Sequence, residues 1–214
     1  MGKKIVTFGE VMMRLAPPGY QRFLQANSFD ATYAGGEANV AASLAQYGHD
    51  AYFVTKLPPH EIGQACRCFL QKYGIKTDYI KMEGSRLGVY FLETGASQRA
   101  SKVIYDRQDS AIAKVQPGEF DWPVIFRDAE YFHITGITPA LSDSAAAVSL
   151  EAVKAARQAG VTVSCDLNFR KNLWSSAKAN EVMSTLMPFV DIAIANEEDA
   201  EKVFGIKADN SEVQ

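Results

Sequence analysis

The sequence has few cysteines and few histidines, which limits the disulfide and metal chemistry open to it. It contains three of each among 214 residues. An odd, small number of cysteines does not make a disulfide framework. Cys66 and Cys68 have no second cysteine pair and no nearby histidine to complete a metal site, so we expect them on a helix without a metal. His133 lies inside the apolar run YFHIT, where we expect a core histidine.

Long hydrophobic stretches and an excess of one charge are also absent. The uncharged stretches fall short of the roughly 20 apolar residues that a membrane helix requires. The first residues, MGKKIVTFGE, lack the apolar core and cleavage site of a signal peptide. With 47% hydrophobic residues, 22% charged residues and a net charge of −3, the composition is that of a soluble globular protein. We therefore expect a cytoplasmic protein that binds small molecules, without a nucleic-acid or membrane partner.

Strand-like and helix-like segments alternate along the chain, which is typical of an α/β fold with a wound, mostly parallel sheet. Gly48 and Gly74 each follow a segment with apolar residues at helical spacing, and Ser142 precedes another. The expected strands are residues 5–8, 51–55, 131–134, 161–165 and 191–195, and the expected helices are residues 38–47, 61–73, 143–159 and about 177–187.

Two segments, residues 11–33 and 86–107, contain no convincing helix. Within the second, GVYFLETG and SKVIYDR alternate in polarity on either side of turn residues around 95–101, which predicts a β-hairpin. We expect the two segments to form a small β lid, and its outward apolar side chains (Val89, Phe91 and Ile104) predict a homo-oligomer contact, in a dimer or higher oligomer. The α/β core is then residues 1–10, 34–85 and 108–214.

Polar residues follow two expected strands and precede one expected helix. In open parallel sheets, ligands bind beyond the carboxyl ends of the strands. A helix start also supplies free N–H donors, and glycines let the backbone approach a ligand closely. Such groups together predict a small-molecule site. They are Asp166, Asn168 and Arg170, whose alternate positions in the stretch DLNFR predict one face of a strand end, Asn196 and Asp199 in the stretch NEED, and Gly35, Gly36 and Asn39 in the stretch GGEAN.

The predicted hairpin carries further candidate ligand-binding residues. Tyr105 and Arg107 are two apart and so share a face of their strand, while Tyr90 lies on the paired strand. Hydroxyls suit sugar oxygens, and an arginine fork suits a carboxylate. An arginine on an edge strand can instead be a solvated residue that blocks aggregation. The combination favours a polyhydroxy acid as the ligand.

These features resemble the 2-keto-3-deoxygluconate kinases, a group within the ribokinase-like (phosphofructokinase B) sugar kinases. The resemblance extends over residues 4–206 and rests on Gly-x-Glu-x-Asn before a helix, Tyr-x-Arg on a hairpin, and the stretches GITPALS, DLNFRKNLW and NEEDAE. It implies a ribokinase-like fold and ATP-dependent phosphorylation of the sugar acid to its 6-phosphate, with Mg²⁺. It also implies substrate-binding roles for Gly35, Gly36, Asn39, Tyr90, Tyr105, Arg107 and Arg170, and ATP-phosphate roles for Asp166, Asn168, Asn196 and Asp199.

The chain departs from the pattern of this family at two places. Asp199 stands where the Asn-x-x-Glu motif usually has glutamate, so any contact with magnesium is expected through water. The Gly-Ala-Gly-Asp motif, which supplies the catalytic base and an anion hole, is absent from the sequence. We therefore expect the base beyond Gln214, and we expect the 214 residues alone to be inactive.

Two alternatives remain open, and a third is disfavoured by a missing motif. The chain can be a fructokinase or another ribokinase-like sugar kinase, because DxNxR followed by LW also occurs in fructokinases. It can be a non-catalytic fragment that binds a sugar acid. A dinucleotide-dependent dehydrogenase would need G-x-G-x-x-G after the first strand, where this chain has Gly9-Glu10-Val11-Met12.

Overall fold

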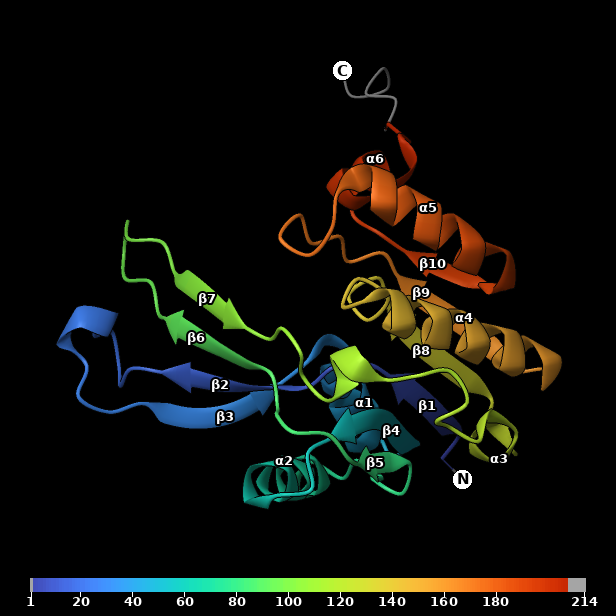
Figure 1. The fold of residues 1–214 in the computed structure, drawn as a ribbon, viewed down its shortest axis with the longest axis horizontal. Coiled ribbons are helices and arrows are strands. Elements are labelled where there is room, and N and C mark those ends of the chain that lie inside the picture. Colours follow the sequence, from blue (N-terminus) through green and yellow to red (C-terminus); the bar gives the residue numbers. More distant parts are fainter. Residues whose placement is uncertain (1, 208–214) are drawn as a thin grey trace.

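The larger of two β-sheets is a six-stranded parallel sheet (Figure 1). The computed structural model describes residues 2–207. The strand order is β10-β9-β8-β1-β4-β5, and every neighbouring pair is parallel. The carboxyl ends of all six strands therefore meet at one edge. The strands are β1 (Lys4–Phe8), β4 (Asp50–Leu57), β5 (Ile80–Met82), β8 (Tyr131–Thr135), β9 (Thr162–Asp166) and β10 (Ile192–Ile194).

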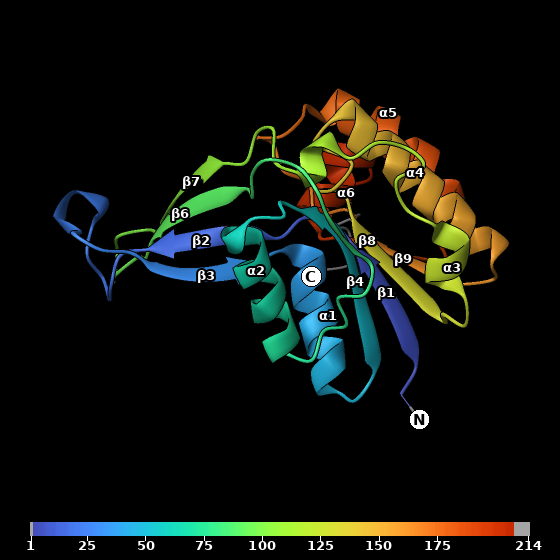
Figure 2. The same cartoon turned by 60° about the horizontal axis from the view of Figure 1, so that its bottom comes forward.

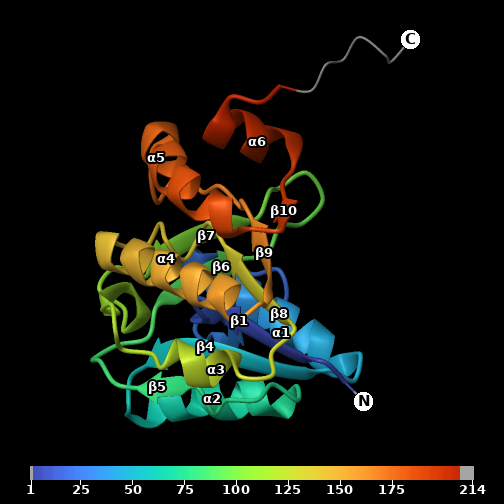
Figure 3. The same ribbon diagram turned by 90° about the vertical axis from the view of Figure 1, so that its right-hand side faces the viewer.

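Helices cover both faces of this sheet. α1 and α2 lie on one face, and α3, α4 and α5 lie on the other (Figure 2). α6 packs against α5, beside β10 (Figure 3). The helices are α1 (Gly36–Gln46), α2 (Glu61–Lys72), α3 (Trp122–Phe126), α4 (Asp143–Gln158), α5 (Ser176–Leu186) and α6 (Glu197–Phe204), with 3₁₀ turns at Phe23–Gln25, Ile112–Lys114 and Met187–Phe189.

The central strands are apolar on both faces because both faces are buried. Along β4, Phe53 belongs to the core beneath α1 and α2, and Val54 belongs to the core beneath α3, α4 and α5. An aromatic cluster dominates the second core. Phe8, at the end of β1, meets the ring of Trp122 edge-on at 5.4 Å, and Trp122 stacks on Phe126 at 5.5 Å.

The predicted strands and helices are present, with ends that shift by at most two residues. Ser142 caps α4 as expected, its hydroxyl accepting a hydrogen bond from the Ala145 N–H at 3.0 Å. Gly48 and Gly74 follow their helices with φ of 84° and 83°, a conformation that favours glycine. β5 and α3 were not predicted, because three to five residues are too few to show a hydrophobic period.

The second sheet has four strands, and we call it the lid sheet. Its order is β3-β2-β6-β7, with antiparallel outer pairs and a parallel central pair. It projects from the core, away from α3, α4 and α5 (Figure 1). β6 and β7 form the predicted hairpin, so the expected fold class, a wound parallel sheet with a small additional β-sheet, is confirmed. The strands are β2 (Met12–Ala16), β3 (Asp30–Ala34), β6 (Val89–Glu93) and β7 (Lys102–Asp106).

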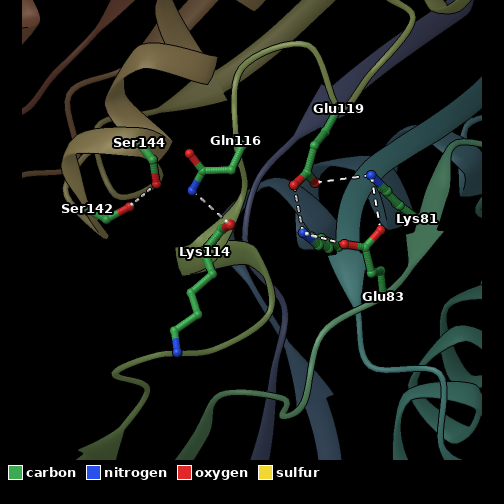
Figure 4. A network of polar contacts seen from close by, with 8 residues as sticks. Lys81, Glu83, Lys114, Gln116, Glu119, Ser142 and Ser144 are labelled. Carbon is green, nitrogen blue, oxygen red and sulfur yellow. Dashed lines mark hydrogen bonds and ion pairs between the residues drawn. The ribbon is translucent and has the colours of Figure 1, made fainter.

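A network of lysines and glutamates joins β4 and β5 to the loop before α3 (Figure 4). Lys56 is 5% exposed, and its Nζ lies 2.8 Å from Glu119 Oε1 and 3.4 Å from Glu83 Oε1. Lys81, on the edge strand, contacts the same two glutamates. Its Nζ lies 3.1 Å from Glu83 Oε2 and 3.5 Å from Glu119 Oε2. Because a buried ammonium is stable only when it is paired, this network fixes the loop over the end of the sheet.

We predict that Lys56→Met destabilises the fold by about 2–3 kcal/mol, because it leaves the largely buried Glu119 with only the more distant Lys81. Lys114→Met is the control, since Lys114 pairs with Asp109 at an exposed site. Its effect should stay within about 0.5 kcal/mol. Urea unfolding of both variants measures the difference, and equal midpoints would show that the network does not contribute to stability.

Candidate functional site

A cleft of about 1070 Å³ lies between the lid sheet and the edge where the core strands end. One wall is the end of β7 and the residues that follow it. The opposite wall is the loop after β9 together with the first turns of α6. Five of the residues expected at a site line this cleft: Tyr105, Arg107, Arg170, Asn196 and Asp199.

The remaining expected residues do not line the cleft. Gly35 and Gly36 are at the start of α1, and a Cβ built at Gly36 would lie 3.8 Å from the side-chain Nδ2 of Asn168. The start of α1 and the loop after β9 are therefore neighbours. Asn39 is exposed one turn along α1 and lines a smaller hollow of about 340 Å³ with Arg14 and Tyr33.

Asp166, Asn168 and Arg170 do not follow one another on a strand face. β9 ends at Asp166, and Asn168 has a left-handed φ of 38°. The Asn168 N–H donates to Asp166 Oδ1 at 3.1 Å, which closes a tight turn. The alternation in the sequence therefore does not place the three side chains together. Of the three residues, only Arg170 lines the cleft.

Asn196 and Asp199 have structural roles at the start of α6. The Asn196 side chain caps the helix by accepting a hydrogen bond from the Asp199 N–H at 2.7 Å. The Asp199 side chain is 8% exposed. Burial raises its pKa, the backbone N–H of Phe169 partly offsets this, and the negative charge of Asp166 raises the pKa further. A cation near the two aspartates would relieve both effects.

A direct metal cage is not evident in residues 2–207, since no three His, Cys, Asp or Glu side chains lie close enough together to hold an ion. Likewise, no helix within this range is long and apolar enough to cross a membrane.

Glu37 occupies the centre of the site region and was not among the predicted site residues. It is fully buried in the first turn of α1, and burial raises its pKa. Its Oε1 accepts hydrogen bonds from the Thr135 N–H at 3.2 Å, the Thr135 hydroxyl at 2.8 Å and the Thr138 hydroxyl at 2.8 Å. Glu37 thereby joins α1 to the end of β8 and to the stretch GITPALS. A glutamate at a helix start is common enough that the sequence alone gave it no special role.

The lid sheet presents a continuous row of polar side chains. Strand pairing places Thr32, Arg14, Tyr90 and Tyr105 side by side across β3, β2, β6 and β7. The Arg14 Nε donates to the Thr32 hydroxyl at 2.9 Å, and the rings of Tyr90 and Tyr105 lie 5.9 Å apart. Burial raises the pKa of Tyr90, and the Arg14 charge partly offsets this. Tyr90 therefore remains a neutral phenol that can donate a hydrogen bond.

Arg107 follows β7 and is not a solvated edge residue, because its side chain is only 11% exposed. Its guanidinium lies 5.5 Å from the ring centroid of Tyr105 and forms an ion pair with Glu10. Glu10 is 2% exposed and also accepts a hydrogen bond from the Ser110 hydroxyl at 3.1 Å. Sequence reasoning missed Glu10, although its position directly after the first strand was a usable signal.

We predict that Gly35→Ala and Gly36→Ala differ strongly although the two glycines are adjacent. An added Cβ at Gly35 would lie 2.0 Å from the Glu10 carbonyl oxygen, whereas at Gly36 it meets only ordinary contacts. The first change should destabilise the fold by about 1–3 kcal/mol through overpacking. The second should be neutral or stabilise α1 by up to about 1 kcal/mol. Thermal unfolding measures both, and equal melting temperatures would contradict the prediction.

Comparisons with known proteins agree with this geometry. The structure of 2-dehydro-3-deoxygluconokinase from Thermotoga maritima has a TM-score of 0.96 and is 53% identical, over 99% of this chain and 65% of that one. The 2-dehydro-3-deoxygalactonokinase of Haloferax volcanii is 36% identical over 98% of this chain and 65% of its own length. Fructokinase-2 of Solanum habrochaites is 28% identical over 94% of this chain and 61% of its own length.

The chain thus spans less than two thirds of the length of each of these relatives. The profile of the pfkB family carbohydrate kinases matches residues 2–214. The chain belongs to the pfkB family of carbohydrate kinases.

Proposed function

We propose that the protein transfers the γ-phosphate of ATP to the 6-hydroxyl of 2-keto-3-deoxygluconate. The observation that carries the proposal is the cleft in which Tyr105 and Arg107 of the lid sheet face Arg170 at the strand ends. Two guanidinium groups and a phenol suit a ligand that has both a carboxylate and hydroxyls. The similarity to kinases named for 2-dehydro-3-deoxy sugar acids supports the same substrate class.

In this proposal the sugar acid contacts residues from both walls of the cleft. Arg107 and Arg170 bind near the carboxylate, and Tyr105 with its neighbour Tyr90 binds hydroxyls. Gly35, Gly36 and Asn39, at the start of α1, shape the rest of the sugar pocket. The lid sheet covers the sugar and excludes water from the transfer.

The phosphates of ATP belong at the opposite wall. The start of α6 offers free N–H donors, which favour anions. Asp166 and Asn168 lie in the adjacent turn, and Asn196 with Asp199 begins α6. In the usual kinase arrangement, magnesium is held by phosphates, water and one or two carboxylates. The isolated pair Asp166 and Asp199 fits that pattern, with Asp199 acting through water. Bound magnesium would neutralise charge on the transferring phosphoryl group.

The chemistry expected of this site is positioning and charge stabilisation. The sugar hydroxyl oxygen forms a bond to the γ-phosphorus as the bond to the bridging oxygen of ADP breaks, and a general base takes the hydroxyl proton. We assign no residue of 2–207 as that base. The residues named above hold the sugar by its carboxylate and hydroxyls so that its 6-hydroxyl meets the γ-phosphate, which lowers the entropic part of the barrier. A cytoplasmic location, expected from the sequence, remains part of the proposal.

Fructose phosphorylation is the second candidate, supported by the similarity to a fructokinase of Solanum habrochaites. A neutral sugar does not require two arginines in the cleft. The charge of the cleft therefore favours the sugar acid.

We predict that the full-length protein with ATP prefers 2-keto-3-deoxygluconate to fructose by at least about 100-fold in kcat/KM, because only the acid engages the arginines. A coupled ADP-release assay on both substrates, with 2-keto-3-deoxygalactonate included, measures the preference. Phosphorus NMR of the product identifies the phosphorylated hydroxyl. Equal efficiency with fructose would overturn the substrate assignment and favour the fructokinase alternative.

We also propose that the outer face of the lid sheet forms a homo-oligomer contact. On this face Leu15, Phe91 and Ile104 are side by side by strand register, and Phe29 packs on Phe91. Ile104 is 51% exposed and Phe29 is 40% exposed. An apolar patch of this kind on an exposed sheet is usually covered.

Light scattering of the full-length protein should give at least a dimer. Ile104→Lys should shift it toward monomer, because the charge would be buried in the contact. Val103→Lys, on the opposite face of β7, is the matched control and should leave the mass unchanged. A wild-type monomer at micromolar concentration would contradict the proposal.

A further inference from the structure

Four chain segments connect the core to the lid sheet, and all four meet at one residue, Glu10. The segments run from β1 to β2, from β3 to α1, from β5 to β6, and from β7 to the 3₁₀ turn at Ile112–Lys114. Glu10 lies in the first. A Cβ added at Gly35, in the second, would lie 2.0 Å from the Glu10 carbonyl oxygen. One added at Gly88, in the third, would lie 3.0 Å from Glu10 Oε1.

The fourth segment supplies the polar partners of this carboxylate. Arg107 Nη2 forms the ion pair with Glu10 Oε2, and the Ser110 hydroxyl donates to Oε1 at 3.1 Å. A nearby cation stabilises a carboxylate this deeply buried, and Arg107 is the only cation among residues 2–207 that forms an ion pair with it. Burial raises the pKa of Glu10, and the Arg107 charge counteracts this.

The same contact restricts Arg107. One end of its guanidinium is held by Glu10, one face lies near the Tyr105 ring, and its buried Nε has no partner among the described residues. An arginine side chain has considerable rotamer entropy, so a fixed fork binds a carboxylate with a smaller entropy loss than a free one. Arg107 lines the cleft in this fixed position.

We propose that Glu10 is a positioning residue that holds Arg107 in place for the carboxylate of the sugar-acid substrate. Glu10 does not touch the substrate and acts only through Arg107. The inference rests on the proposed function, because it requires an acidic ligand in the cleft. It goes further by naming a buried acidic side chain, in the link between the two sheets, as a determinant of specificity for acids.

The test is a double-mutant cycle on the full-length protein, with Glu10→Gln, Arg107→Lys and the two combined. Glutamine matches the shape of glutamate but removes its charge, so Arg107 is released. Glu10→Gln should raise KM for 2-keto-3-deoxygluconate about tenfold and change KM for ATP less than twofold. In the Arg107→Lys background the guanidinium fork is already lost. There, Glu10→Gln should raise KM for the acid by less than a further twofold.

Ser110→Ala is the matched control, because it removes a neutral hydrogen bond to Glu10 and leaves the ion pair. It should raise KM for the acid less than about threefold. If Glu10→Gln folds poorly, Glu10→Asp keeps the charge but withdraws the carboxylate by one carbon. It should raise KM for the acid several-fold without changing KM for ATP.

Two results would overturn the inference while the proposed function stands. One is wild-type activity on the sugar acid with unchanged KM in Glu10→Gln or Glu10→Asp. The other is an equal rise of KM for the acid and for ATP, or changes in KM that are additive in the cycle. Either would mean that Glu10 only stabilises the fold. Wild-type protein without activity on the acid would instead refute the proposed function itself.

Discussion

The buried carboxylate of Glu10 is the constraint on which the arrangement of the two sheets depends. A parallel sheet brings its strand ends together at one edge, and here the chain leaves that edge for the lid sheet at the end of β1. The carboxylate at this exit is out of contact with water, so its charge must be balanced from within the protein. Arg107 balances it from the end of the last lid strand. The ion pair thus joins the segment between β1 and β2 to the segment that follows β7.

Glu37, in the first turn of α1, is a second buried carboxylate whose polar atoms must be satisfied within the protein. Its buried carboxylate is satisfied by three donors from Thr135 and Thr138, which fixes the start of α1 against the end of β8. Gly9 packs directly on this carboxylate, since a Cβ there would lie 2.2 Å from Glu37 Cδ. Gly35 packs in the same close way on the backbone carbonyl of Glu10. Both glycines therefore serve close packing of the chain, and neither lines the cleft.

Much of the fold was predictable because the relevant signals are local. The helical period and caps of α1, α2, α4 and α5, and the alternating hairpin of β6 and β7, are visible in the sequence. The pairing of Glu10 with Arg107, 97 positions apart, is not visible in the sequence, because no local pattern encodes a contact between distant segments. For residues 166–170, a local pattern was visible but led to a wrong prediction. Their alternation suggested a strand face, whereas the left-handed Asn168 turns the chain after Asp166.

In the proposed site, the buried Glu10 holds Arg107 in the cleft, where its guanidinium meets an anionic substrate. A crystal structure of the full-length protein with 2-keto-3-deoxygluconate and a non-hydrolysable ATP analogue tests this most directly. The account predicts the sugar carboxylate within hydrogen-bonding distance of the Arg107 guanidinium, with the Glu10 ion pair intact. A carboxylate bound only by Arg170, or an Arg107 that leaves Glu10 to reach the ligand, would contradict it.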